Sequence, residues 1–157
     1  MSGIIGGAGS KSGIIGTTEL DYEEGEWNPT VLSSGGGTWT LGSSGDTGWY
    51  TKIGQLVTIG GMIVITSVTN PHSGNLSFTL PFTPGDSEGD GDYTFGNVYI
   101  ANHGGDWGSD RIDIFIYSAS NGNLHKTSPT GAGAYIDTGD VDEAWQFGFS
   151  MSYHTDV

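Results

Sequence analysis

The sequence contains no cysteine, and only 4 of its 157 residues are Lys or Arg, against 18 Asp and Glu. Without cysteine the chain has no disulfide framework, no thiolate nucleophile and no cysteine ligand for zinc. The formal net charge of −14 excludes the basic surface that neutralises nucleic-acid phosphates, and it opposes binding to anionic membranes. We therefore expect neither nucleic acid nor a membrane among the partners.

Long apolar runs are also absent. The longest, Met62–Ile65, is far too short to cross a bilayer. The first sixteen residues, MSGIIGGAGSKSGIIG, contain neither a charged segment nor a continuous hydrophobic segment of the kind that a secretion signal requires. The sequence therefore predicts a product that is made in the cytoplasm.

Glycine is abundant instead, with 29 residues, and charged residues make up 14% of the chain, below the usual ~25%. Residues 1–18 stand apart because SGIIG occurs twice, at Ser2–Gly6 and Ser12–Gly16. We expect an extended Gly/Ile-rich anchor here and one domain over residues 19–157. The alternative is a frayed tail with a chance repeat. The anchor would dock its isoleucines into a partner or a neighbouring subunit: Ile4, Ile5, Ile14 and Ile15.

From residue 19 onward the patterns are those of an all-β domain. Leu56–Val68, Arg111–Tyr117 and Ala144–Tyr153 each place large apolar residues at alternate positions on one face, as half-buried antiparallel strands do. The pair Gly60–Gly61 indicates either a bulge or close packing in the first of them. Shorter candidate strands are Trp27–Leu32, Thr38–Leu41, Trp49–Ile53, Asn75–Thr79 and Asp92–Ala101.

Turn-forming clusters separate these segments, and no stretch of ten residues has a helical apolar period. Eight or nine short strands joined by Gly, Asn, Asp and Pro predict an antiparallel β-sandwich or jelly roll. Arg111–Tyr117 carries Phe115 and Tyr117 opposite its isoleucines, so its second face needs cover. Either a homo-oligomer or a thicker core within one chain would supply that cover.

The sequence contains one candidate metal site and no candidate catalytic residues. The acidic loop holds alternating carboxylates that suit calcium, but Asn97 replaces the glutamate that would complete an EF-hand loop. The four histidines have no zinc-site spacing. No nucleophile motif is present, and we expect neither an enzyme nor a cofactor. The calcium candidates are Asp86, Glu88, Asp90 and Asp92.

Loop aromatics beside amides and carboxylates are the better signal, because sugar rings offer C–H faces for stacking and hydroxyls for hydrogen bonding. The loop NHGGDWGSD supplies the candidate glycan-binding residues Asn102, His103, Asp106 and Trp107. Asn121, Asn123 and His125 form a weaker second candidate. The alternative for Trp107 is that it folds back over the edge of the sandwich.

Two stretches, LDYEEGEWNPTV (Leu20–Val31) and GWYTKIGQLVTIGGMIVI (Gly48–Ile65), resemble a module of tailed bacteriophages, widespread in those of marine and cyanobacterial hosts. That module commonly opens with a YEEGTWTP-like stretch and continues with a GYYTKIGNLVTVSG-like strand pair, an LPF element and an ANH-like loop. The C-terminal SMSYHT is also similar. The matches here follow the same order: Tyr22–Pro29, Trp49–Gly60, Leu80–Phe82 and Ala101–His103.

The resemblance implies a β-rich, trimeric structural or host-adhesion domain of the kind found at the C-terminal end of tail fibres and other virion appendages. It implies no catalytic residues. We accordingly expect a virion protein, a small fibre or decoration subunit that is attached to other virion proteins through residues 1–18. The domain would then serve host adhesion or capsid or tail decoration. The alternative function is a lectin-like adhesin that binds a host-surface glycan.

Apart from the resemblance, the matched residues have structural roles. Glu23, Glu24 and Glu26 place negative charge beside the first strand, which discourages edge-to-edge aggregation. Gly54–Gln55 reads as a two-residue hairpin loop. Lys52 is expected to pair with the glutamate cluster.

Overall fold

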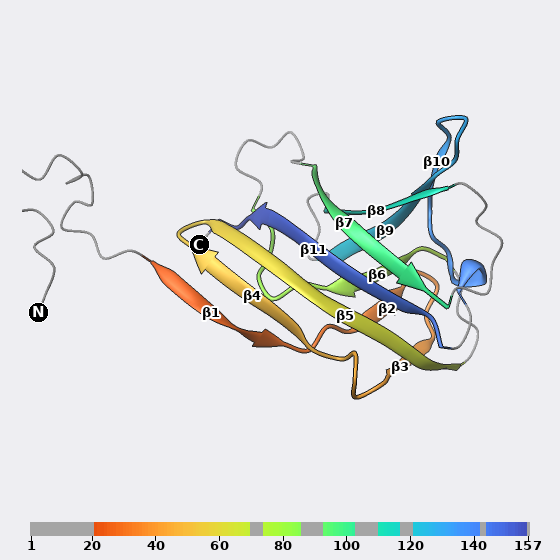
Figure 1. The fold of residues 1–157 in the computed structure, drawn as a ribbon, viewed down its shortest axis with the longest axis horizontal. Helices are drawn as coiled ribbons and strands as arrows, with labels where there is room; N and C mark the ends of the chain where they lie inside the picture. The colour runs from red at the N-terminus through yellow and green to blue at the C-terminus, as the bar shows by residue number, and fades with distance from the viewer. Residues whose placement is uncertain are drawn as a thin grey trace, which may run out of the picture.

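The computed structural model describes residues 21–69, 74–85, 93–102, 110–116, 121–141 and 144–156. Within these ranges the chain is almost entirely antiparallel β-structure, with one short 3₁₀ helix, η1 (Thr138–Asp140) (Figure 1). None of the described helical segments is long and apolar enough to cross a membrane. The strands are β1 (Tyr22–Trp27), β2 (Val31–Ser33), β3 (Thr38–Leu41), β4 (Gly48–Ile53), β5 (Leu56–Thr69), β6 (Leu76–Thr79), β7 (Thr94–Ala101), β8 (Arg111–Ile116), β9 (Asn121–Thr127), β10 (Gly133–Tyr135) and β11 (Gln146–His154).

All eleven strands belong to one sheet, which confirms the predicted all-β class. The main path runs β1-β4-β5-β11-β7-β8-β9-β6-β2, while β3 pairs with β5 and β10 pairs with β9. Figure 1 shows the sheet curled into a half-barrel, with β6 and β2 behind β5 and β11. The two layers of the predicted sandwich are therefore two halves of one curled sheet.

The core lies between these halves. Phe78 on β6 is fully buried, and its ring centroid lies 4.8 Å from that of Phe149 and 5.8 Å from that of Phe147, both on β11. Strands β6 and β11 are not neighbours in the sheet, so these contacts join one half to the other. Trp145, also fully buried, packs on Phe147 at 4.8 Å. The alternation predicted for the last strand is thus confirmed, with its large residues inside.

The central strand β5 shows why its two glycines are needed. A side chain on Gly60 would meet the Trp49 ring at 2.4 Å, and one on Gly61 would meet the Gly48 backbone at 2.9 Å. Register along β5 is continuous at this point with both β4 and β11. Of the two interpretations of the pair, close packing is therefore the one observed.

The hairpin between β4 and β5 is the predicted two-residue loop. Ile53 and Leu56 are register partners, and Gly54 has φ +57, which glycine adopts without steric cost. The Gly54 amide donates to the Asp21 carbonyl at 2.7 Å. The loop is thereby linked to the residue that precedes β1.

Strand boundaries differ most from the prediction near the N-terminal edge of the sheet. The expected strand Trp27–Leu32 is divided: β1 ends at Trp27, and β2 begins at Val31. The glutamate-rich stretch expected to precede the first strand forms most of β1, which lies at one edge of the sheet. Negative charge therefore lies on an edge strand, where it opposes pairing with another chain.

Lys52 pairs with a different carboxylate from the one predicted. Its Nζ lies 2.8 Å from Asp21 Oδ2, and its side chain is buried. Glu23 instead accepts a 2.7 Å hydrogen bond from Tyr50 Oη, and Glu24 accepts one from Tyr22. These bonds raise the pKa of both tyrosines above the ordinary value. Glu23 and Glu24 of β1 thus bind tyrosines, while Lys52 pairs with the aspartate that precedes the strand.

Candidate functional site

A continuous row of side chains crosses the outer face of five strands. Register partners connect Phe95 on β7 to Phe115 on β8, Phe115 to Asn123 on β9, and Asn123 to Ser77 on β6. Leu32 on β2 is the partner of Ser77 and completes the row. Register partners in an antiparallel sheet point to the same side, and Ile114, Leu124 and Phe78 face the core from the alternate positions. We call this row the outer-face row.

Aromatic rings gather at the β7–β8 end of the row. Phe115 is only 8% exposed and forms the floor, whereas Tyr93 and Phe95 are 58% and 66% exposed. Phe95 lies 6.4 Å from Phe115 between centroids, and Tyr93 stacks on Phe95 at 6.3 Å with an interplanar angle of 11°. Together with His125 and Tyr135 these rings line an open pocket of about 300 Å³.

Strand β10 carries the last ring into this cluster. Tyr135 is the register partner of His125, and the two rings meet edge to face at 5.8 Å. Tyr135 also lies 5.5 Å from Phe115. A side chain on Gly133 would meet the His125 ring at 2.5 Å, so glycine is needed there for His125 to lie against β10. The hairpin that contains β10 projects beyond the sheet in Figure 1.

The other end of the row is polar and hollowed. A second open pocket, of about 410 Å³, contains amide and hydroxyl groups and shares Tyr135 with the aromatic pocket. Asn123 donates from Nδ2 to the backbone carbonyl of Asn121 at 3.4 Å. The Ser34 hydroxyl accepts a 3.0 Å hydrogen bond from the backbone N–H of Asn75. The pocket is lined by Leu32, Ser33, Ser34, Asn75, Ser77, Asn121, Asn123 and Tyr135.

This combination of surfaces suits a sugar chain. The face of an aromatic ring is electron-rich and attracts the weakly positive C–H groups on the flat side of a pyranose. An asparagine amide offers both a carbonyl acceptor and an NH₂ donor, and a serine hydroxyl does both through one atom. Neutral hydroxyls of a sugar can therefore pair with either. Among the described residues that line the two pockets, none is Asp, Glu, Lys or Arg.

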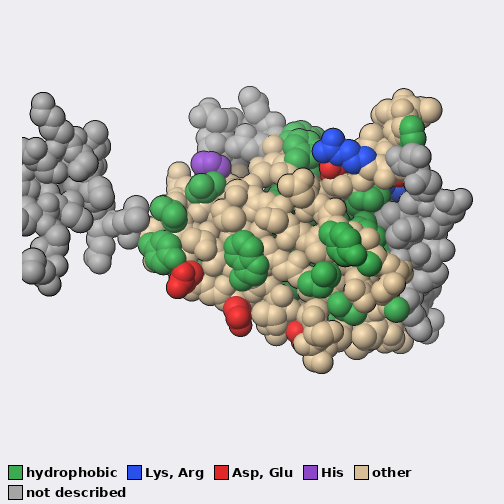
Figure 2. Space-filling model, in the orientation of Figure 1, with side chains coloured by type: hydrophobic (Ala, Val, Ile, Leu, Met, Phe, Trp, Pro, Cys, Tyr) green, Lys and Arg blue, Asp and Glu red, His purple; other side chains and the backbone are tan. Residues whose placement is uncertain are grey.

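The described Lys and Arg side chains, near the site and elsewhere, are each paired with an aspartate. Arg111 Nε donates to Asp113 Oδ1 at 2.9 Å on β8, beside the aromatic pocket. Lys126 Nζ contacts Asp140 Oδ1 at 2.6 Å, and Lys52 pairs with Asp21 at the other end of the molecule. Figure 2 shows that Lys and Arg cover only a small area of the face in view. Each described cation is thus engaged with an aspartate.

The predicted glycan residues are only partly placed. Asn102 follows β7, is exposed and has φ +56, a left-handed conformation that asparagine tolerates better than most residues. His103, Asp106 and Trp107 lie outside the described residues, as do the four predicted anchor isoleucines and the acidic loop that was the calcium candidate. In the described part of the chain, no group of three or more His, Cys, Asp and Glu could hold a metal ion.

The second, weaker candidate falls within the site. Asn121 and Asn123 line the polar pocket, and His125 lines the aromatic one. Sequence reasoning missed the aromatic residues that complete it, namely Tyr93, Phe95 and Tyr135. The available signal was the two-sided apolar pattern of the Arg111–Tyr117 segment, since Phe115 is the floor on which those rings pack. The second face of β8 is therefore covered, at Phe115, from within the same chain.

A further pocket, of about 620 Å³, lies at the opposite end of the sheet, beside the buried Lys52. The ammonium group lies 6.0 Å from the centre of the Phe82 ring and is neutralised by Asp21. Asp156 adds a second carboxylate to the lining. A lysine that is already paired offers little further attraction to an anion. We therefore interpret the Lys52–Asp21 pair as a structural contact between β4 and the residue before β1.

Comparison with known proteins gives one informative result. No protein-family model matches the chain, and no curated protein matches it in sequence. Among solved structures, the fold is similar to part of the crystal structure of Dettilon tailspike protein (gp208), with a TM-score of 0.64 and 19% sequence identity. The similarity covers 85% of this chain and 24% of that chain. The chain therefore has the fold of a segment that spans about a quarter of a phage tailspike protein.

Proposed function

We propose that this chain is a virion-associated adhesion subunit of a tailed bacteriophage, and that it presents its outer-face row to a glycan on the host surface. The observation that carries the proposal is the aromatic pocket beside the amide-lined pocket, on a fold similar to part of a tailspike. Exposed aromatic rings that surround a buried one are costly in water unless a ligand covers them. Adhesion supplies such a ligand.

The site favours binding of the glycan without hydrolysis. A glycosidase needs two carboxyl groups flanking the scissile bond. Asp113, the described carboxylate nearest to the aromatic floor along β8, already accepts a hydrogen bond from Arg111. The lectin-like alternative is thus part of the same proposal: a virion subunit whose task is to bind sugar.

We propose that residues 1–18 attach the protein to the particle and that the protein assembles as a homotrimer. Both follow the resemblance of the motifs to fibre modules and the repeated SGIIG sequence. Four isoleucines in a glycine-rich segment gain free energy when they dock into an apolar partner surface. A small fibre or a head or tail decoration is equally compatible with this arrangement.

Deletion of residues 2–18 tests the virion role. We expect the truncated protein to keep the circular-dichroism spectrum and melting behaviour of the full chain, because the described core lies within residues 21–156. We expect it to be absent from purified phage particles, measured by immunoblot against the full-length protein expressed from the same plasmid. Normal incorporation of the truncated protein would show that the attachment lies elsewhere.

A further inference from the structure

We infer that the outer-face site selects an uncharged oligosaccharide of at least two sugar residues, with one ring on the Phe95–Phe115–Tyr135 cluster and the next in the amide-lined pocket. This inference rests on the proposed adhesion function and names its ligand class. The arrangement of the two pockets supports the minimum length, and the small number of Lys and Arg residues supports the absence of charge on the ligand.

The geometry sets the minimum length. Phe115 and Asn123 are register partners on adjacent strands, so the aromatic and polar pockets are next to each other, and Tyr135 forms a wall of both. A single pyranose can fill one pocket but leaves the other empty. A disaccharide or longer chain that crosses Tyr135 stacks in the first pocket and hydrogen-bonds in the second.

The small number of Lys and Arg residues counts against acidic sugars. A desolvated carboxylate or sulfate needs a cation or several strong donors to replace its hydration. The whole sequence holds four Lys and Arg residues. Lys11 lies outside the described residues, and each of the other three is already bound to an aspartate. The segments between the described ranges contain no Lys or Arg that could reach the site.

Long-range electrostatics act in the same direction. A formal charge of −14 repels an anionic polysaccharide as it approaches. Added salt weakens this repulsion because it shortens the Debye length, which is about 8 Å at physiological ionic strength. Stacking and neutral hydrogen bonds have no such dependence. Binding of an uncharged glycan should therefore be almost independent of ionic strength.

A panel of immobilised polysaccharides tests the ligand class with the full-length protein. The neutral members are dextran, laminarin, yeast mannan and galactan, and the acidic members are dextran sulfate, alginate and hyaluronan. Dextran and dextran sulfate form a pair with the same glucan backbone, in which sulfate esters replace hydroxyls and add negative charge. We expect retention on at least one neutral polymer, none on the acidic ones, and little change in affinity between low and high salt.

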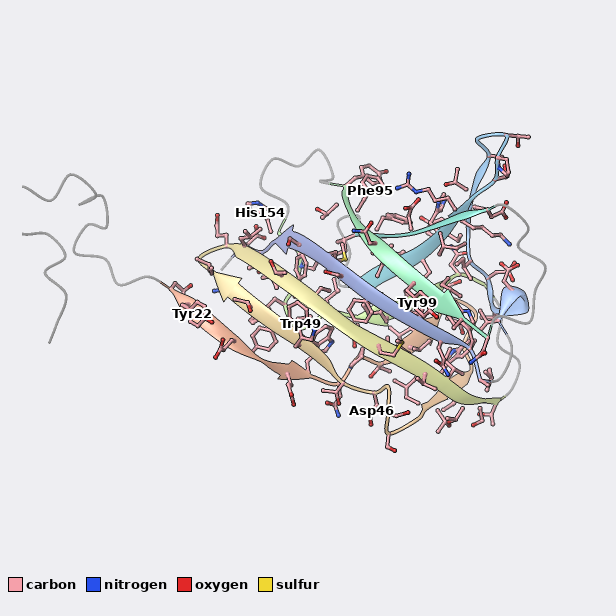
Figure 3. The ribbon with its side chains drawn as sticks, in the orientation of Figure 1. Tyr22, Asp46, Trp49, Phe95, Tyr99 and His154 are labelled. Carbon is pink, nitrogen blue, oxygen red and sulfur yellow. The ribbon has the colours of Figure 1, made fainter. Side chains whose placement is uncertain are left out.

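Variants locate the binding. Phe95→Ala removes an exposed stacking ring, and Asn123→Asp keeps the size of the side chain but replaces its NH₂ donor. Each should weaken binding of the retained neutral polymer about tenfold or more. Tyr99→Ala is the control, because Tyr99 is 63% exposed on the same face of β7 and lies further along that strand from Phe95 (Figure 3). It lines neither pocket and should leave binding unchanged.

The outcomes separate the two proposals. Retention on acidic polymers alone would overturn the inference of an uncharged ligand and leave the adhesion function standing. Neutral binding that survives both Phe95→Ala and Asn123→Asp would place the ligand elsewhere and also overturn it. If no polymer is retained, the ligand class is wrong, while incorporation of the subunit into particles still tests the virion role separately.

Discussion

Replacing Phe78 with alanine is expected to lower the free energy of unfolding by about 3–5 kcal/mol. Phe78 is fully buried on β6, and it packs on Phe147 and Phe149 of β11 across the core. Gly122 lies directly against the same ring, since a side chain there would meet it at 2.6 Å. Loss of the ring therefore leaves a cavity between the two halves of the sheet.

Urea denaturation followed by tryptophan fluorescence measures this loss. The total stability of a domain is usually about 5–15 kcal/mol, so Phe78→Ala should leave a protein that is folded only in mild conditions. Tyr99→Ala is the control, because an exposed side chain on the outside of the sheet should change stability by about 0.5 kcal/mol or less. A loss below about 1 kcal/mol for Phe78→Ala would mean that the halves are not held together through this ring.

Alkaline pH is expected to destabilise the fold through Tyr153. This residue is 1% exposed on β11, and its hydroxyl donates to the Phe82 carbonyl at 3.0 Å and accepts from the Phe82 amide at 3.3 Å. Burial raises its pKa from 10.0 to about 12. The folded state thus favours the protonated phenol, and the stability this provides is complete below pH 10 and is lost as the pH rises through 12.

The loss over that window should approach roughly 3 kcal/mol for this residue. Urea midpoints measured from neutral pH to above the raised pKa give the curve. Tyr153→Phe should be less stable by about 1–2 kcal/mol at neutral pH, because Phe82 loses its partner, and its curve should fall less steeply. A residual fall is expected from Tyr22 and Tyr50, whose pKa values are also raised. Parallel curves for the two proteins would contradict this assignment.

The strands that the sequence predicted well are those with the most regular alternation. β8 and β11 place large apolar residues at every second position, and β5 does so except at Gly61, Ser67 and Thr69, so local pattern and final burial agree. β9 was missed because NGNLHKT carries one large apolar residue, Leu124, among polar ones and a glycine. Its strand conformation comes from pairing with β6, β8 and β10, which no short window of sequence contains.

The candidate site was predictable only where its residues are close together in the sequence. Asn121, Asn123 and His125 are close together in the sequence and could be recognised as sugar-binding residue types. Phe95, Phe115 and Tyr135 come from three different strands, and they meet only because of the register of β7, β8, β9 and β10. The ring cluster is therefore a product of the topology, and it becomes visible only when the strands are placed.

Adsorption of the purified full-length protein to a panel of bacterial strains is the most direct test of the proposal that the outer-face site mediates adhesion. Wild type, Phe95→Ala and Tyr99→Ala should be labelled identically and compared by flow cytometry over a range of concentrations. We expect saturable binding for wild type and Tyr99→Ala, and binding at least about tenfold weaker for Phe95→Ala. Equal binding by all three proteins would contradict it.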